Sequence, residues 1–231
     1  MLNEAVLILF YVIILIYSVI IHEVAHGVGA LFLGDNTAKY AGRLSLNPLK
    51  HIDPYMTIMV PILMLILTAG RFAFGGAKPV PYNPYNLRNQ KWGPGLVAAS
   101  GPGSNILIAL VFAVAAKFTG LTAAAKVDII ANFYNWSEIA PIIAGSVQAV
   151  FFEIFIMIIF WNVLLAFFNL IPISPLDGSK LLFYILPIKI ETIAMLEQFG
   201  FIILIAFIIL FSQPLGYFLN IMLGLFFSIT I

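Results

Sequence analysis

Two histidines and a glutamate form the clearest chemical motif of this chain. His22, Glu23 and His26 give the pattern His-Glu-x-x-His inside a long apolar run. On a helix, residues four apart lie one above the other, so both imidazoles can reach one metal ion. A zinc ion lowers the pKa of a water molecule to about 7, and a neighbouring carboxylate such as Glu23 can take its proton. The motif therefore predicts zinc-dependent hydrolysis rather than two core histidines beside a chance glutamate.

A catalytic zinc site also needs a third protein ligand and an open position. The chain contains no cysteine, so His51 and the carboxylates are the candidates. Asp177 stands out, because Pro172 and Pro175 stop the preceding helix and the pair Asp177-Gly178 is turn-like. An aspartate just past the end of an apolar span lies close to membrane depth. An ordinary turn or helix-capping aspartate is the alternative.

The composition places this chemistry in a membrane. Of the 231 residues, 62% are hydrophobic and 9% are charged, against about 25% charged residues in soluble domains. A soluble fold of this size cannot bury so much apolar surface, and the same numbers exclude disorder. The absence of cysteine excludes disulfides and thiol catalysis, and a net charge of +1 gives no sign of nucleic-acid binding. We expect a polytopic membrane protein with a single domain, residues 1–231.

An all-α bundle with about four to six transmembrane helices is the expected fold. The long apolar runs lie at residues 5–33, 94–117, 140–169 and 199–231, the last as one span plus a second, shorter one. Residues 56–70 are apolar but short and contain Pro61, which predicts a re-entrant segment. A short amphipathic helix is predicted at 180–188. The core would cover roughly residues 5–190, followed by C-terminal apolar helices at 196–231.

The basic residues set the predicted orientation. Residues 34–55 and 71–93 together carry seven of the 11 lysines and arginines, whereas 118–139 carries one. The positive-inside bias places the first two segments in the cytosol and the third outside, and the N-terminus is then also outside.

This orientation tests the choice of the third ligand. If residues 56–70 return to the side they left, Asp177 arrives on the cytosolic side at the depth of His26. Had that segment crossed fully, Asp177 would lie on the opposite face from the histidines. The charge pattern therefore favours both the re-entrant segment and a metal site toward the cytosol.

Several motifs resemble the site-2 protease family of intramembrane zinc metalloproteases. They are His22-Glu23-x-x-His26, Asn169-x-x-Pro172, Leu176-Asp177-Gly178, and Ser100-Gly-Pro-Gly-Ser-Asn105, which is similar to the Gly-Pro-x-x-Asn signature of that family's next core helix. Residues 46–54 and 77–81 are similar to a compact prokaryotic branch without a PDZ or CBS domain. The resemblance covers roughly residues 15–180. Ser179 stands where the family more often has glycine.

The resemblance implies roles for individual residues. His22, His26 and Asp177 would bind zinc and Glu23 would be the general base. Asn105 and Asn169 would lie near the site. There a side-chain amide could hydrogen-bond the substrate backbone or an oxyanion, and hydrogen bonding between helices is the alternative.

Three further features are candidates for supporting roles. Glu153 lies in the middle of an apolar helix, where a bare carboxylate is costly, so it is protonated, paired or facing a water path to the zinc. His51 could support the site or contact substrate, although we favour an interfacial turn residue. The stretch from Pro79 to Tyr85 cannot continue a helix and could hold an extended substrate by β-addition.

The sequence therefore predicts a zinc-dependent intramembrane endopeptidase acting in or near transmembrane segments of membrane-protein substrates. A small irregular or β element is expected at its cytosolic face. One alternative is a membrane zinc peptidase for soluble or prenylated peptides, which would use a glutamate as its third ligand. Another is a metal transporter or a catalytically silent protein that binds membrane helices. Transport would need polar groups along a path across the bilayer.

Overall fold

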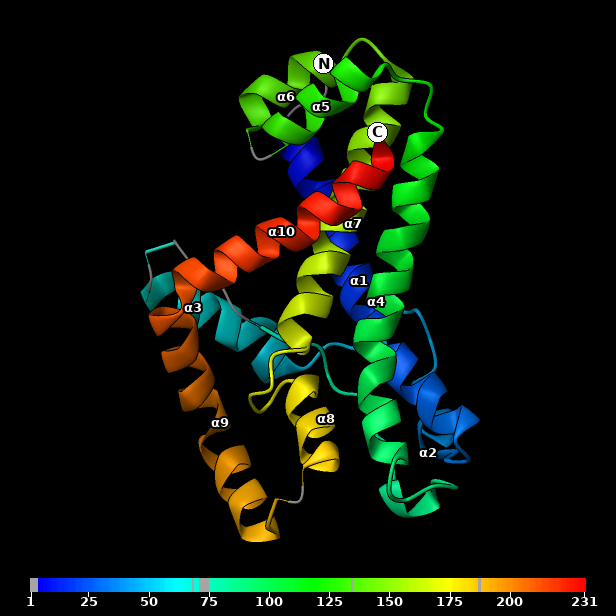
Figure 1. Cartoon of the computed structure of the whole chain (residues 1–231), viewed down its shortest axis with the longest axis vertical. Coiled ribbons are helices and arrows are strands. Elements are labelled where there is room, and N and C mark those ends of the chain that lie inside the picture. The colour runs from blue at the N-terminus through cyan, green and yellow to red at the C-terminus, as the bar shows by residue number, and fades with distance from the viewer. Residues whose placement is uncertain (1–3, 68, 71–74, 134, 187) are drawn as a thin grey trace.

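The protein folds as a bundle of helices (Figure 1). The computed structural model describes residues 4–67, 69–70, 75–133, 135–186 and 188–231, and no strand occurs among them. The α-helices are α1 (Glu4–Phe32), α2 (Thr37–Tyr40), α3 (Val60–Leu67), α4 (Gly93–Lys117), α5 (Ala123–Asn132), α6 (Trp136–Ile143), α7 (Val147–Asn169), α8 (Asp177–Ile185), α9 (Ile190–Leu210) and α10 (Ser212–Thr230). Tighter or wider turns occur at η1 (Pro48–Lys50), η2 (Pro54–Met59) and η3 (Pro84–Asn86).

Five of these helices are long and apolar enough to cross a membrane. They are α1 from Ile8 onward, α4, α7, α9 and α10. This number confirms the polytopic all-α prediction. The C-terminal apolar part begins at Ile190, six residues before the predicted start, and the predicted amphipathic helix at 180–188 is α8, which begins earlier, at Asp177.

Helices α1, α4 and α7 form the core, with α4 packed against both of the others. Ala109, Ala113 and Ala116 recur on one face of α4 and are fully buried. They belong to the same buried cluster as Phe152 and Ile156 of α7. Lipid is as apolar as the helices, so close packing of small side chains is what draws membrane helices together. The alanine face therefore lets α4 approach α7 closely.

The segment between α1 and α4 returns to the end of the bundle that it left. The N–H of Arg88 donates to the carbonyl of Leu33 at 2.8 Å, which joins the two ends of this segment. The apolar helix inside it, Pro54–Ile66, is shorter than the about 20 residues that a span requires. This arrangement is the one expected of a re-entrant segment. Residue 68 and residues 71–74, including the basic Arg71, lie outside the described part of the chain.

An extended stretch from Lys78 to Asn83 forms the irregular element at this end of the bundle. The Lys78 N–H donates to the His51 carbonyl at 2.8 Å, and the Lys78 carbonyl accepts from Arg43 Nη2 at 2.7 Å. The Asn83 N–H donates to Asp35 Oδ2 at 2.8 Å. Of the two forms predicted for this element, irregular or β, the described residues adopt the irregular one.

Asp35 is the buried anchor of this element. Its carboxylate accepts hydrogen bonds from the Thr37 hydroxyl and N–H, from Asn86 Nδ2 and from the Asn83 N–H. Burial alone would raise the pKa of Asp35, but the hydrogen bonds from Thr37, Asn86 and Asn83 outweigh it and hold the pKa below its ordinary value. Asp35 therefore stays ionised and joins the end of α1 to the stretch before α4.

The last two helices lead from one end of the bundle to the other. In Figure 1, α9 starts at the end where α8 lies, and α10 finishes near α5 and α6. The ammonium of Lys126 holds the C-terminal end of α10 beside the end of α4, because it donates to the carbonyls of Lys117 at 2.9 Å and Thr230 at 2.8 Å. Together, α9 and α10 thus pass once from one end of the bundle to the other, and α10 ends level with the last turn of α4. We call this path the single net passage.

This path predicts which residues share a side of the membrane. Single cysteines can be introduced without background, because the chain contains none. We expect Asp128→Cys and Ile231→Cys to react with a membrane-impermeant maleimide from one side, and Gln90→Cys to react from the other. Labelling of Ile231→Cys and Gln90→Cys from the same side would contradict the single net passage.

Candidate metal centre

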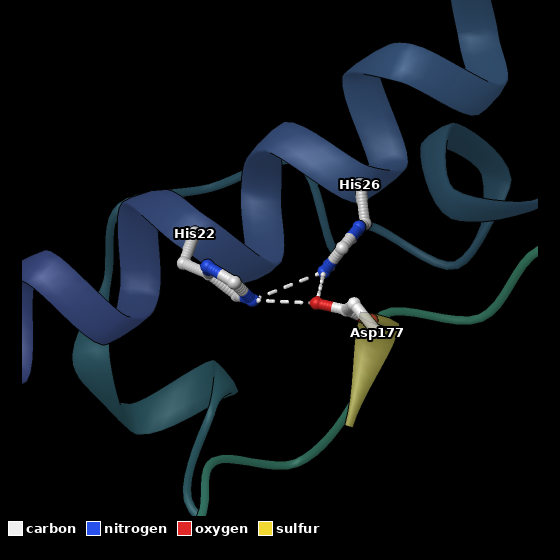
Figure 2. A group of neighbouring side chains, drawn as sticks. All are labelled: His22, His26 and Asp177. Atoms are coloured by element: carbon white, nitrogen blue, oxygen red, sulfur yellow. Dashed lines mark hydrogen bonds and ion pairs between the residues drawn. The ribbon is translucent and has the colours of Figure 1, made fainter. Parts of the chain in front are cut away.

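Three side chains converge at one point between α1 and the start of α8 (Figure 2). His22 and His26 lie one turn apart on α1, and their Nε2 atoms are 3.1 Å from each other. Asp177 Oδ2 lies 3.1 Å from His22 Nε2 and 3.0 Å from His26 Nε2. The i, i+4 spacing places the two imidazoles on one face of the helix. The structure thus brings together the three residues that the sequence singled out as metal ligands.

The hydrogen bonds behind the imidazoles decide which nitrogen of each ring faces this point. His26 Nδ1 lies 2.7 Å from the Val97 carbonyl, which can only accept, so Nδ1 carries the proton. His22 Nδ1 lies 2.6 Å from Asn105 Oδ1, also an acceptor. With Nδ1 engaged in this way, Nε2 is the nitrogen of each ring that faces Asp177.

The resulting donor set fits a zinc ion. Two imidazole nitrogens and a carboxylate oxygen form a triangle with sides of 3.0–3.1 Å. Zinc with ligand distances of about 2.0–2.1 Å would have tetrahedron edges of about 3.3 Å. A proton can bridge one imidazole and the carboxylate, whereas a metal cation between them could take an electron pair from all three atoms at once. The types of the donor atoms and the distances between them thus match a three-ligand zinc site with one position open.

The chain around Asp177 packs tightly enough to fix the carboxylate. A Cβ on Gly178 would lie 2.5 Å from the Ile171 carbonyl oxygen and closer still to that of Leu170, so only glycine fits there. Lys180 Nζ lies 3.5 Å from Asp177 Oδ1, on the side away from the histidines. One carboxylate oxygen therefore faces the imidazoles and the other faces the ammonium.

Gly101 of α4 forms one wall of the centre. A Cβ at this position would lie 2.7 Å from His22 Cε1 and 2.5 Å from His26 Cε1, and closer still to His26 Nε2. Any side chain would enter the space of the imidazoles. The absence of one lets α4 pass directly beside the point at which the three donors meet.

Glu23 lies on the wall of the same cavity. Its Oε2 accepts a hydrogen bond from the Val80 N–H at 3.1 Å, so the extended stretch described above holds its side chain. The cavity is lined by His22, Glu23, His26, Pro79, Val80, Tyr82, Val97, Ala98, Asn169, Pro175, Asp177 and Lys180. A carboxylate thus lines the same cavity as the three donor residues.

The two asparagines that the sequence singled out occupy different places. Asn169 lines the cavity, and its Nδ2 donates to the Leu165 carbonyl at 2.9 Å. Asn105 is completely buried behind His22, and its side-chain oxygen faces the imidazole rather than the cavity.

The two remaining candidates lie away from the cavity lining. His51 is buried at the start of the re-entrant segment and its Nε2 donates to the Ser45 carbonyl at 2.7 Å. Glu153 is buried in α7, and neither of its oxygens has a hydrogen-bond partner in the described part of the chain. Asp177, and not Glu153, therefore accompanies the histidines.

Several residues of the centre escaped the sequence analysis. The Val97 carbonyl and the Val80 N–H are backbone groups, which no side-chain motif reveals. Gly101 lies inside the Gly-Pro-x-x-Asn signature, but its contact with the imidazoles depends on how α4 crosses α1. Asn162 supports Asn105 through a 2.7 Å hydrogen bond, and its only signal was a polar side chain within an apolar helix.

Comparison with known proteins supports the chemistry of this centre. Residues 10–212 match the family model of Peptidase family M50. The chain is 36% identical over 208 residues to "Putative zinc metalloprotease YwhC" of Bacillus subtilis (strain 168), covering 90% of this chain and 82% of that protein. It is 28% identical over 193 residues to "Putative zinc metalloprotease Rip2" of Mycolicibacterium smegmatis (strain ATCC 700084 / mc(2)155), covering 83% of this chain and 63% of that protein. No solved structure gives a significant match.

The contact of Gly101 with the imidazoles predicts a sharp difference between two glycines of α4. We expect Gly101→Ala to lower the amount of zinc retained by the purified protein, because the new methyl group displaces both rings. Gly103→Ala is the matched control, since a Cβ there has nothing within 4 Å. Zinc per chain can be measured by atomic emission. Equal zinc content in the two variants would contradict this account of the wall.

Proposed function

Because the chain belongs to Peptidase family M50, the site-2 protease family, we propose that it hydrolyses peptide bonds in or near the membrane-spanning segments of other proteins. The family and the names of its relatives support a zinc metalloprotease. The single observation that carries the proposal further is the meeting of His22 Nε2, His26 Nε2 and Asp177 Oδ2 beside Glu23.

His22, His26 and Asp177 would hold the zinc ion and leave its fourth position to solvent or substrate. When bound there, zinc supplies Lewis acidity toward a peptide carbonyl and makes a water molecule nucleophilic at neutral pH. The protonated Nδ1 atoms of both histidines keep the Nε2 lone pairs directed at this position. The protein's part in this step is to keep the three donors in place.

Glu23 would act as the general base. One of its oxygens is held by the Val80 N–H, which leaves the other to take the proton of the attacking water. The same carboxyl would then pass that proton to the amine that leaves when the peptide bond breaks. Its position in the cavity that the three donor residues also line supports this role.

The substrate would approach through the cavity between α4, α8 and the stretch from Lys78 to Asn83. A membrane helix must unwind to expose a peptide bond, and an extended chain could lie along this stretch. Asn169 lines the cavity and its side-chain oxygen could accept a hydrogen bond from the substrate backbone. Water would enter from the cytosolic side, where we place the centre, with the N-terminus outside.

The role of Glu23 can be separated from metal binding by one substitution. We expect Glu23→Gln to keep zinc, because Glu23 is outside the donor set, but to lose at least about 100-fold in cleavage rate. Asp177→Ala is the comparison, and it should lose both zinc and cleavage. Cleavage of a membrane-protein substrate in proteoliposomes, with zinc content measured on the same samples, checks both. Normal cleavage by the Gln variant would refute the assigned base.

A transporter built on the same centre predicts a different outcome in liposomes. Glu153 lies nine positions before Asn162, about 13.5 Å along α7, and it has no hydrogen-bond partner in the described structure. The polar groups near the centre therefore do not continue across the bundle. We expect no zinc-dependent flux above that of empty liposomes when an entrapped zinc dye is monitored. Flux that Asp177→Ala abolishes would favour transport instead.

A further inference from the structure

A chain of buried polar side chains crosses the three core helices behind His22. It joins His22 and Ser18 of α1 to Asn105 of α4 and Asn162 of α7. These four residues are at most 5% exposed. Water therefore has no access with which to replace a bond that is broken, and the direction of each hydrogen bond matters.

The direction of these hydrogen bonds is set first by a backbone carbonyl of α7. The carbonyl oxygen of Ile158 lies 2.8 Å from the Asn162 side chain. A carbonyl can only accept a hydrogen bond, so the Asn162 atom that faces it must be the amide nitrogen. The side-chain oxygen of Asn162 must then point the other way, toward Asn105.

The same reasoning fixes Asn105. The atom of Asn105 that lies 2.7 Å from Asn162 Oδ1 must be its amide nitrogen, which also lies 3.3 Å from the Ser18 carbonyl. The side-chain oxygen of Asn105 is therefore left for His22, whose Nδ1 lies 2.6 Å away. An amide oxygen accepts, so Nδ1 must carry the proton and Nε2 must carry the lone pair.

We propose that Asn162 is a positioning residue for the zinc site, acting through Asn105 to fix the protonated nitrogen of His22. The Ile158 carbonyl sets Asn162, Asn162 sets Asn105, and Asn105 sets the imidazole. Asn162 touches neither the cavity nor the donor atoms, so its effect is carried by hydrogen-bond direction alone. The inference rests on the proposed function in that His22 is taken as a zinc ligand.

The Ser18 carbonyl favours the same orientation of Asn105, through a 3.3 Å contact that is longer than the 2.7 Å bond to Asn162. The side chain of Ser18 belongs to the same network but cannot set its direction. Its hydroxyl accepts from Asn162 Nδ2 at 2.9 Å. A hydroxyl can either donate or accept, so it adapts to the amide rather than orienting it. Ser18→Ala therefore removes one buried hydrogen bond and leaves the direction from Ile158 to His22 intact. It is the matched control for a purely structural loss.

The first experiment measures zinc affinity by competition with a chelator. We expect Asn162→Leu, which is similar in size, to weaken zinc binding on the order of 10–100-fold, and Ser18→Ala to weaken it much less. Asn162→Ser is the milder variant if the leucine variant does not fold, and a hydroxyl of free direction should still give a loss. Equal losses for Asn162→Leu and Ser18→Ala would overturn the proposal.

The second experiment tests whether the effect passes through Asn105. If it does, adding Asn162→Leu to Asn105→Leu should produce no further loss of zinc affinity, because the downstream group is already missing. Independent structural damage would add instead. Additive losses in the double variant would therefore also overturn the proposal.

The third experiment reads the ring directly in zinc-free protein by nitrogen NMR at mildly alkaline pH. Nδ1 of His22 should carry a proton in every molecule of the wild type. In Asn162→Leu, a share of the molecules should lack this proton. The other two histidines are internal references, because His26 faces the Val97 carbonyl through Nδ1 and His51 faces the Ser45 carbonyl through Nε2. An unchanged His22 signal would refute the relay. This measurement stands even if the protein binds no zinc, an outcome that would defeat the proposed function instead.

Discussion

The structure depends on holding three electron-pair donors at one point inside an apolar bundle. The Nε2 atoms of His22 and His26 and the Oδ2 atom of Asp177 approach within 3.0–3.1 Å. Without a proton or a metal ion between them, such donors repel one another in a medium of low dielectric, so the fold must bring them together by its own packing. The turn of α1 places two of them, the tight path around Gly178 places the third, and Gly101 leaves the space they need. A bound cation would turn this repulsion into stability, which couples metal binding to the fold.

The membrane explains why each donor is held from behind. In lipid there is no water to satisfy a polar group that loses its partner. Both imidazoles accordingly have a hydrogen-bond acceptor at Nδ1, a backbone carbonyl for His26 and a side-chain amide for His22. The side-chain amide of Asn105 needs hydrogen-bond partners of its own. One of them is Asn162, which lies on the third core helix, α7. The pairing of these buried groups thus extends the site well beyond the groups that meet at its centre.

The sequence predicts the parts of the site that depend on local spacing or on counting crossings. His22 and His26 follow from the period of one helix, and Asp177 follows because the charge pattern returns the chain to the histidines' side. The rotation of one helix against another produces no comparable pattern in the sequence. Asn105 was expected near the centre, but whether it faces the cavity or the back of His22 depends on how α4 crosses α1. Glu153 was singled out by the cost of a buried carboxylate, and nothing in the described structure joins it to the centre.

Two separate systems position the two halves of the candidate site. The two imidazoles are fixed from within the bundle, by α4 and α7. Glu23 is fixed from the stretch between Lys78 and Asn83, because its carboxylate binds the Val80 N–H and this stretch is tied to Arg43, His51 and Asp35. A substrate that entered beside this stretch would meet the proposed base and its support together. Rearrangement of the entry side could therefore change access to Glu23 while leaving the three donors undisturbed.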